Sequence, residues 1–288
     1  MSWQLVKLNG EIAGVAIADW LTAGFDPPED QRPAPAESAG DADDDLLSPE
    51  WLRSRLDTRL ATWLILPSAE QSRREHWQAA LADLPVQVSF GRAGLALALS
   101  ALRTHDRPAR LMAADQIDGR QWLSLTLAPG KQGVTIQHSA MDGRLAGHND
   151  LTSLLAQAQM AEPAIEVLVC PDYPRDAGLE RLMPFLASLT SWSRPELRWE
   201  FPEQLLPPCG VVGAIWGLYW LLDGYRLGDW HRPGALLSLD EHSPLAGVTV
   251  VAPVQGSGAP AFGPAALDAP ALGDATQDDE AAEAARYG

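Results

Sequence analysis

The longest apolar run of the chain, CGVVGAIWGLYWLL at residues 209–222, places the strongest constraint on its fold. The run has no charged residue, and its 14 residues fall short of the about 20 that a helix needs to span a bilayer. It also contains three glycines. Helices of small residues let backbones approach closely, so this segment is expected to be a buried helix packed between other layers.

A second small-residue helix is predicted over residues 93–103, and both helices stand in the same order of elements. Each follows a short strand and precedes two more, which indicates a duplicated α/β layered fold. The strands predicted are 12–21, 61–66, 86–90, 109–114, an apparent pair at 121–127 and 133–138, then 165–170, 197–201, 235–240 and 247–253. Further helices are predicted at 68–81 and 177–189.

Two segments differ from the rest in composition and bound the domains. Residues 26–49 and 256–288 are rich in Pro, Gly, Ala and acidic side chains, which cannot bury enough apolar area to offset ordering. We therefore expect an N-terminal half at 1–150 with a mobile acidic insertion at 26–49, a C-terminal half at 151–255, and a disordered acidic tail at 256–288.

The charge balance excludes several classes of partner. A formal charge of −17 opposes binding to nucleic acid or anionic lipid unless the basic residues form a local patch. The basic residues are scattered. Those nearest to a cluster, Arg53/Arg55/Arg59 and Arg73/Arg74, are expected on solvated helix faces. Two cysteines are too few for a disulfide framework or a structural zinc site. The start MSWQLVKLNGEIAG has no signal-peptide pattern. These features favour a cytoplasmic protein without metal, cofactor or membrane insertion.

The turn SFGRAGLALALSAL and the segment PPCGVVGAIWGL carry a resemblance to a known family. They resemble the two helix-start signatures of the thiolase and β-ketoacyl synthase superfamily, Cys-x-Ser-Gly/Ser-Leu and His-x-x-Gly-Ala-Ala-Gly-Ala. Gly94 and Leu95 match the first, and Gly210, Gly213 and Ala214 match the second. The resemblance implies a five-layer αβαβα fold with two pseudo-symmetric halves, reduced in size.

The resemblance also implies that the catalytic residues of the family are missing. Its nucleophilic cysteine, which the helix N-terminus activates, falls at Gly91. One catalytic histidine falls at Pro207 and the other near Pro171. The chain is therefore predicted to be a pseudoenzyme, with Gly91 at the degenerate nucleophile position.

Other candidate site residues have more ordinary interpretations. Cys209, which precedes the apolar helix, is the remaining catalytic candidate, although most such cysteines are small core residues. His138 and His148, with Asp142 and Asp150, match no metal-ligand spacing, and His231 and His242 are expected in surface loops. The acidic pair Asp115/Asp118 says little without geometry, and Ser139 and Ser257 lie in no Gly-x-Ser-x-Gly motif.

The tryptophans of the second half leave two interpretations open. Trp216, Trp220 and Trp230 are expected in the core, and the alternative is an aromatic surface that binds a protein, since tryptophan is enriched in binding hot spots. The resemblance implies a dimer through the 86–90 strand as the default, or a hetero-partner.

Together these features predict a bacterial, non-catalytic thiolase-like protein that acts by protein–protein interaction. It would be an adaptor or scaffold, for example for a secretion-system effector, or the partner subunit of a ketosynthase. The alternatives are an acyl-transfer or condensing enzyme that uses Cys209, and a binder of an acyl-type small molecule.

Overall fold

The computed structural model describes residues 1–25, 47–117, 119–131, 133–142, 151–171, 188–239 and 245–254. Most of the predicted helix at 177–189, most of the 26–49 insertion and the whole 256–288 tail lie outside these residues. So do Asp118, His148, Asp150, His242 and Ser257.

The strands of the described residues join in one mixed sheet that folds into two groups with the same topology. In sheet order, the first group is β4 (Val86–Phe90), β3 (Ala61–Leu66), β5 (Ala109–Gln116), β6 (Arg120–Pro129) and β1 (Ser2–Ile12). The second is β9 (Arg198–Glu200), β8 (Val167–Val169), β10 (Gly234–Leu239), β11 (Ala246–Pro253) and β7 (Val134–Asp142). Numbered along the chain within its group, each has the order 3-2-4-5-1, with the fifth strand antiparallel to both neighbours. The predicted internal pseudo-symmetry is therefore present.

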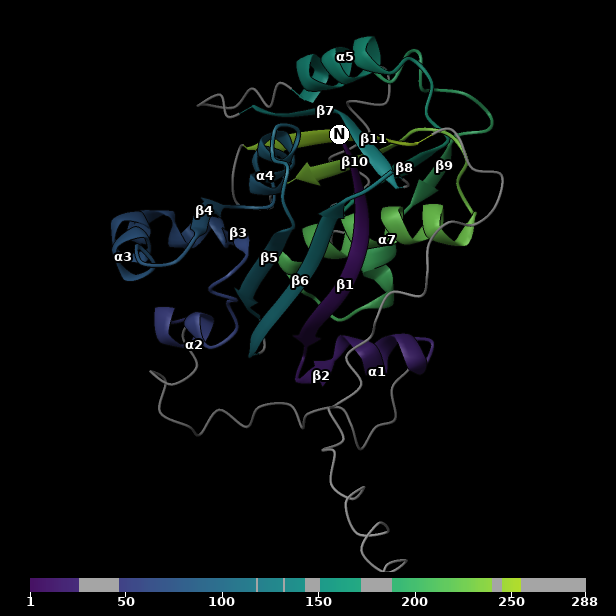
Figure 1. Ribbon diagram of the computed structural model, residues 1–288. Helices are drawn as coiled ribbons and strands as arrows, with labels where there is room; N and C mark the ends of the chain where they lie inside the picture. Colours follow the sequence, from purple (N-terminus) through teal and green to yellow (C-terminus); the bar gives the residue numbers. More distant parts are fainter. Residues whose placement is uncertain are drawn as a thin grey trace, which may run out of the picture.

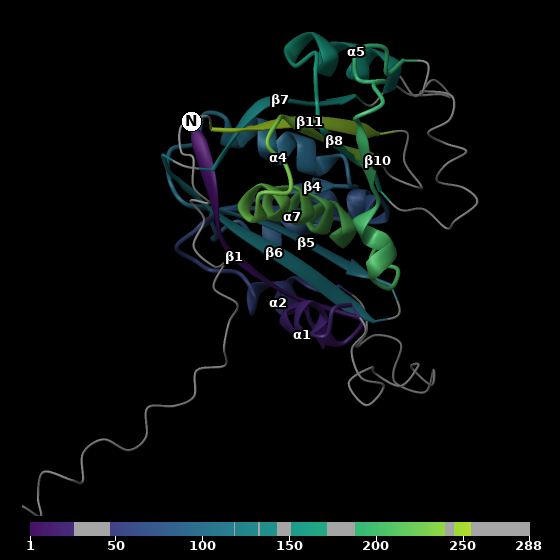
Figure 2. The same ribbon diagram turned by 90° about the vertical axis from the view of Figure 1, so that its right-hand side faces the viewer.

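Each group of strands forms one sheet layer, called the first and the second sheet below. With three layers of helices, one between the sheets and one on each outer face, they make five layers (Figures 1 and 2). The central layer holds α4 (Gly94–Leu102) and α7 (Val212–Leu227). Beyond the second group lies α5 (Leu151–Ala161), and beyond the first lie α2 (Pro49–Arg53), η2 (Ser68–Arg73) and α3 (Arg74–Ala80). The short α1 (Ile17–Thr22) follows β1 and its partner β2 (Val15–Ala16), and η3 (Pro202–Leu205) precedes α7.

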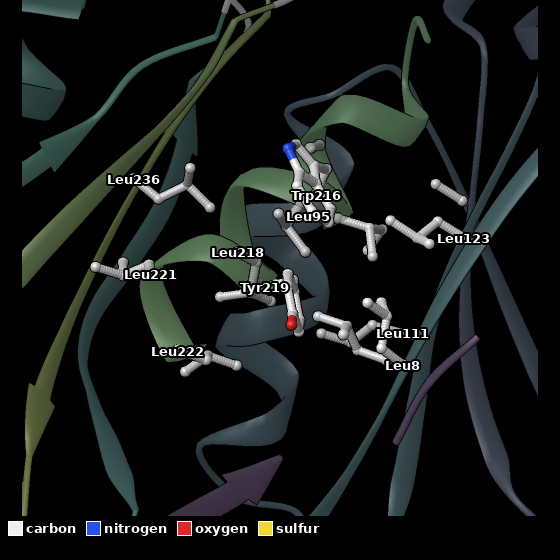
Figure 3. Packing of buried hydrophobic residues seen from close by; sticks show 14 of the residues in the cluster. Leu8, Leu95, Leu111, Leu123, Trp216, Leu218, Tyr219, Leu221, Leu222 and Leu236 are labelled. Carbon is white, nitrogen blue, oxygen red and sulfur yellow. The ribbon is translucent and has the colours of Figure 1, made fainter. Parts of the chain in front are cut away.

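The main core lies between the two sheets. Trp216, Tyr219 and Leu218 of α7 pack among Leu95 of α4 and leucines of β1, β5 and β6 (Figure 3). Each central helix contacts the sheet of the other half, with α4 against β7 and β11 and α7 against β5 and β6. The apolar runs that dominate the sequence thus become the layer that both halves share, as expected.

Two expected features of the strands are wrong. The first strand spans Ser2–Ile12 rather than residues 12–21, because Ala13 and Gly14 take positive φ angles of 49° and 74° and end it in a turn. Strands β6 and β7 do not pair with each other, because β1 lies between them and β7 pairs with β11. The topological repeat therefore begins at β7, ahead of residue 150.

Candidate functional site at the tips of the central helices

The turn between β4 and α4 places Gly91 directly ahead of the central helix, as the sequence predicts. Gly91 is buried and has φ +75°, a left-handed conformation that glycine adopts without steric cost. Its N–H donates to the carbonyl of Leu66 over 2.7 Å, and its own carbonyl accepts the N–H of Gly94 over 2.9 Å. Residue 91 therefore contributes a backbone turn to this site and no reactive side chain.

A buried ion pair lies beside this turn and joins the two halves. The Nη1 of Arg92 lies 2.6 Å from Oε1 of Glu203, and both side chains are 7% exposed. Arg92 lies between Gly91 and the first residue of α4, whereas Glu203 belongs to η3, the short helix that precedes α7. Glu203 fits because residue 213 is glycine: a Cβ there would lie 2.4 Å from its carboxyl carbon. The pair holds the two helix starts together.

The N-terminus of α7 is occupied by a carboxylate. Oδ2 of Asp115 accepts the N–H of Val211 over 2.7 Å, and Oδ1 accepts the N–H of Gln116 over 2.7 Å. A negative charge here offsets the positive end of the helix macrodipole. Nε2 of Gln121 adds a contact to the carbonyl of Pro208, 3.1 Å away. A backbone N–H at this helix start, which could otherwise attract an anionic reaction intermediate, is thus already hydrogen-bonded to the chain's own carboxylate.

The cysteine candidates lie in the core. Cys209 is 3% exposed, and its carbonyl accepts the N–H of Val212 over 3.0 Å as α7 begins. Cys170, at the end of β8, is 1% exposed, and burial raises the pKa of its thiol well above the ordinary range. A thiol in such surroundings is a poor nucleophile, because the thiolate is the reactive form. Pro171 is buried next to Cys170.

The tryptophans offered as an interaction surface need correction. Trp216 is fully buried and its Nε1 donates to the carbonyl of Pro202, and Trp230 is 6% exposed. Trp220 is half-buried against the same core. Trp216 on α7 and Trp230 just after this helix both belong to the core between the sheets, so core packing accounts for them.

The histidines do not assemble into a site in the described part of the chain. His138 lies on β7, where burial and then Arg103 lower its pKa. His231 is exposed, and its backbone N–H donates to the carboxylate of Glu166 over 2.7 Å. Among the residues described, no three His, Cys, Asp or Glu side chains converge as metal ligands would.

Sequence reasoning missed the charged residues that do meet at the helix tips. Arg92 stands in the otherwise apolar run FGRAGLALAL, and a charge there signals a buried partner. That partner is 111 residues away, so the fold was needed to identify Glu203. The arginines expected on solvated faces also include one exception: Arg55 is half-buried, with its guanidinium carbon 4.1 Å from the ring centroid of Trp51.

Comparison with solved structures decides the fold. The ketosynthase of module 6 of the bacillaene synthase from Bacillus subtilis 168 superposes with a TM-score of 0.59 at 9% identity, over 89% of this chain and 71% of that one. The oxazolomycin ketosynthase domain from Streptomyces albus JA3453 gives 0.54 at 11% identity, over 87% and 95% of the two chains. This is the thiolase-like fold of the ketosynthases.

A third ketosynthase-type structure has the same thiolase-like fold at a lower score. The ishigamide ketosynthase/chain length factor superposes with a TM-score of 0.50 at 11% identity, over 88% of this chain and the whole of that one. No sequence-family model and no curated protein sequence matches the chain. In the described residues, no helix is both long and apolar enough to cross a bilayer.

Proposed function

We propose that this thiolase-like chain carries out no acyl chemistry at its helix tips and acts by binding another protein in the bacterial cytoplasm. The observation that supports this most directly is the buried pair of Arg92 and Glu203 beside Gly91. At the position that the resemblance assigns to a nucleophile there is only backbone. Two charged side chains beside it bond each other, and so they stabilise the fold instead of a reacting group.

The docking surface that we propose is the free edge of β4. This strand pairs with β3 and lies at the end of the sheet order among the described strands. The N–H of Thr62 donates to the carbonyl of Pro85, and the N–H of Gly91 donates to the carbonyl of Leu66, so on the β4 side the parallel ladder uses the backbone groups of odd-numbered residues. The N–H groups of Val88 and Phe90 therefore point to the open edge, where another strand can pair, whereas the N–H of Val86 already donates to the carbonyl of Leu84 over 2.8 Å.

The other end of the sheet offers much less. There β9 spans only Arg198–Glu200, which gives few backbone groups for a partner strand. Helix α4, which contacts β4, also carries an exposed apolar side chain, because Leu97 is 47% exposed. An adaptor or scaffold, such as one for a secretion-system effector, and the partner subunit of a ketosynthase both fit a chain that binds through this edge.

The test of binding is the Val88→Pro variant. Proline removes one outward N–H and leaves the hydrogen bonds to β3 in place. Light scattering during size-exclusion chromatography, with pull-down from the native host, should show an assembly for the wild type that the variant loses. The control is Met160→Lys, which changes an apolar residue 79% exposed on α5 and should leave the assembly intact. A wild-type chain that stays monomeric and captures nothing contradicts the proposal.

The absence of acyl chemistry has its own test. The full chain is incubated with acetyl-CoA and measured by intact-protein mass spectrometry, with Cys209→Ser in parallel. We expect no acetyl adduct on either protein. An adduct on the wild type that the variant lacks would establish the alternative, an acyl-transfer enzyme that uses Cys209.

A further inference from the structure

Three arginines and two tryptophans gather on the outer face of the first sheet, away from the helix tips. We call them the Arg–Trp cluster: Trp51 of α2, Arg55 just after it, Arg110 of β5, and Arg120 and Trp122 of β6. Trp122 packs on the outer core under α2 and α3, whereas its neighbour Leu123 belongs to the core between the sheets. The cluster and the helix tips therefore lie on opposite faces of the sheet.

Aromatic rings and backbone contacts hold these guanidinium groups in place. Arg55 lies over Trp51, and its guanidinium carbon is also 5.8 Å from the centroid of Trp122. The guanidinium carbon of Arg120 is 5.6 Å from the centroid of Trp51. Arg55 Nη1 donates to the carbonyl of Trp51 over 3.1 Å, and Arg110 Nη1 donates to that of Arg55 over 3.2 Å. Because the side chains are already ordered, little rotamer entropy is left for a ligand to remove.

Hydrogen-bond donors exceed acceptors in the cluster. The Nε atoms of Arg55, Arg110 and Arg120 and the Nε1 of Trp122 are buried and have no acceptor among the described residues. Buried donors of this kind are costly unless a partner satisfies them. Arg53, in contrast, bonds the carboxylate of Asp83. Arg55 and Arg120 both lie by the ring of Trp51, and Arg55 also lies by Trp122, whereas Arg110 is six residues along β5 from the partner of Arg120. The unsatisfied donors of Arg55, Arg120 and Trp122 indicate that an acceptor with several oxygens binds beside Trp51, with Arg110 adding positive charge next to Arg55.

The charges are equally unbalanced. Within the described chain no carboxylate lies within ion-pair distance of the three arginines. The carboxylate of Glu11 attracts the positive charge of Arg55 at longer range. Glu11 lies on β1, directly across from Trp122 of β6. Burial lowers the pKa of Arg55, Glu11 opposes this, and the nearby positive charge of Arg120 lowers it further. Among the residues that the structure describes, three positive charges stand against one negative charge, a surplus of two, in a chain whose formal charge is −17.

We propose that the Arg–Trp cluster is a binding site for a phosphate monoester. A phosphate group carries a charge of about −1.5 to −2 at neutral pH and three strong acceptor oxygens. That charge and those oxygens fit the surplus of charge and donors, whereas one carboxylate supplies a single charge. Guanidinium groups bind phosphate oxygens in a bidentate manner. This site is separate from the β4 edge and does not depend on the proposed function.

The test is titration of the full chain by calorimetry with inorganic phosphate and with phenyl phosphate. Sodium acetate at matched ionic strength serves as the comparison ion. We expect both phosphates to bind, and at least tenfold weaker binding in Arg55→Gln and in Arg120→Gln. The matched control is Arg53→Gln, at the end of α2 and two residues before Arg55, which should bind within twofold of the wild type. Circular dichroism confirms that each variant is folded, and Arg120→Lys, which keeps the charge, should lose less affinity than Arg120→Gln.

Three outcomes would overturn the proposal. The first is that neither phosphate binds to the wild type. The second is that acetate binds as tightly, since the cluster would then be a general site of positive potential. The third is that phosphate binds only to a variant in which Asp43, Asp44 and Asp45, which precede α2 in the sequence, are all changed to Asn. The chain's own carboxylates would then compete with phosphate for the arginines. Binding of phenyl phosphate but not inorganic phosphate supports an ester ligand.

Discussion

Removing one partner of the Arg92–Glu203 pair should destabilise the protein more than removing both. The side chains are each 7% exposed and 2.6 Å apart, so Arg92→Met leaves a buried carboxylate and Glu203→Leu leaves a buried guanidinium. Loss of one partner from a buried pair costs about 3 to 5 kcal/mol. The double variant replaces both charges with apolar groups of similar volume, which is often close to neutral.

The measurement is urea unfolding of the wild type, the two single variants and the double variant. With a slope of about 3 kcal/mol/M, a loss of about 3 kcal/mol moves the midpoint by about 1 M. The double variant should lie nearer to the wild type than either single variant, which gives a large coupling energy. Arg53→Met, which breaks the exposed pair with Asp83, should shift the midpoint far less. If the two single losses simply add in the double variant, the pair does not join the helix tips as we describe.

Other predictions concern the same region. Gly213→Ala should destabilise the protein, because the added methyl group would collide with Glu203, and thermal unfolding should show a lower midpoint than for Ala214→Gly. Gly91→Ala should cost about 1 to 2 kcal/mol in urea unfolding, because L-residues disfavour its positive φ; an unchanged midpoint would mean that the turn relaxes. In native protein at pH 8, Cys170 should resist iodoacetamide, because burial raises its thiol pKa, and Cys209 should react slowly for lack of exposure. Rapid labelling of either thiol before unfolding, followed by peptide mapping, would contradict this.

Much of the layered fold can be predicted from the sequence, because the apolar small-residue helices have few alternatives to a central position. The duplicated order of strands around them is also visible. The place of β1 is not, because a strand from the start of the chain inserts between β6 and β7, which are neighbours in sequence. Local pattern carries no information on such a long-range pairing.

The site is less predictable than the fold. Gly91 can be placed at a helix tip from its neighbours, since a glycine between a strand and a small-residue helix marks a turn. The partner of Arg92 cannot, because Glu203 comes from the other half. In the sequence, Arg55 resembles a residue on a solvated helix face. The indole of Trp122, which lies beside its guanidinium group, belongs to a strand more than sixty residues further along the chain.

The position of β1 has a consequence for how the protein folds during its synthesis. Its Ser2 and Trp3 pair with Thr135 and Val134 of β7, and the rest of the strand pairs with β6. The residues that leave the ribosome first therefore wait until more than a hundred others have been synthesised before they find both neighbours. Until then the nascent chain exposes two strand edges that attract other chains, so a chaperone that shields the first residues would raise the yield of folded protein.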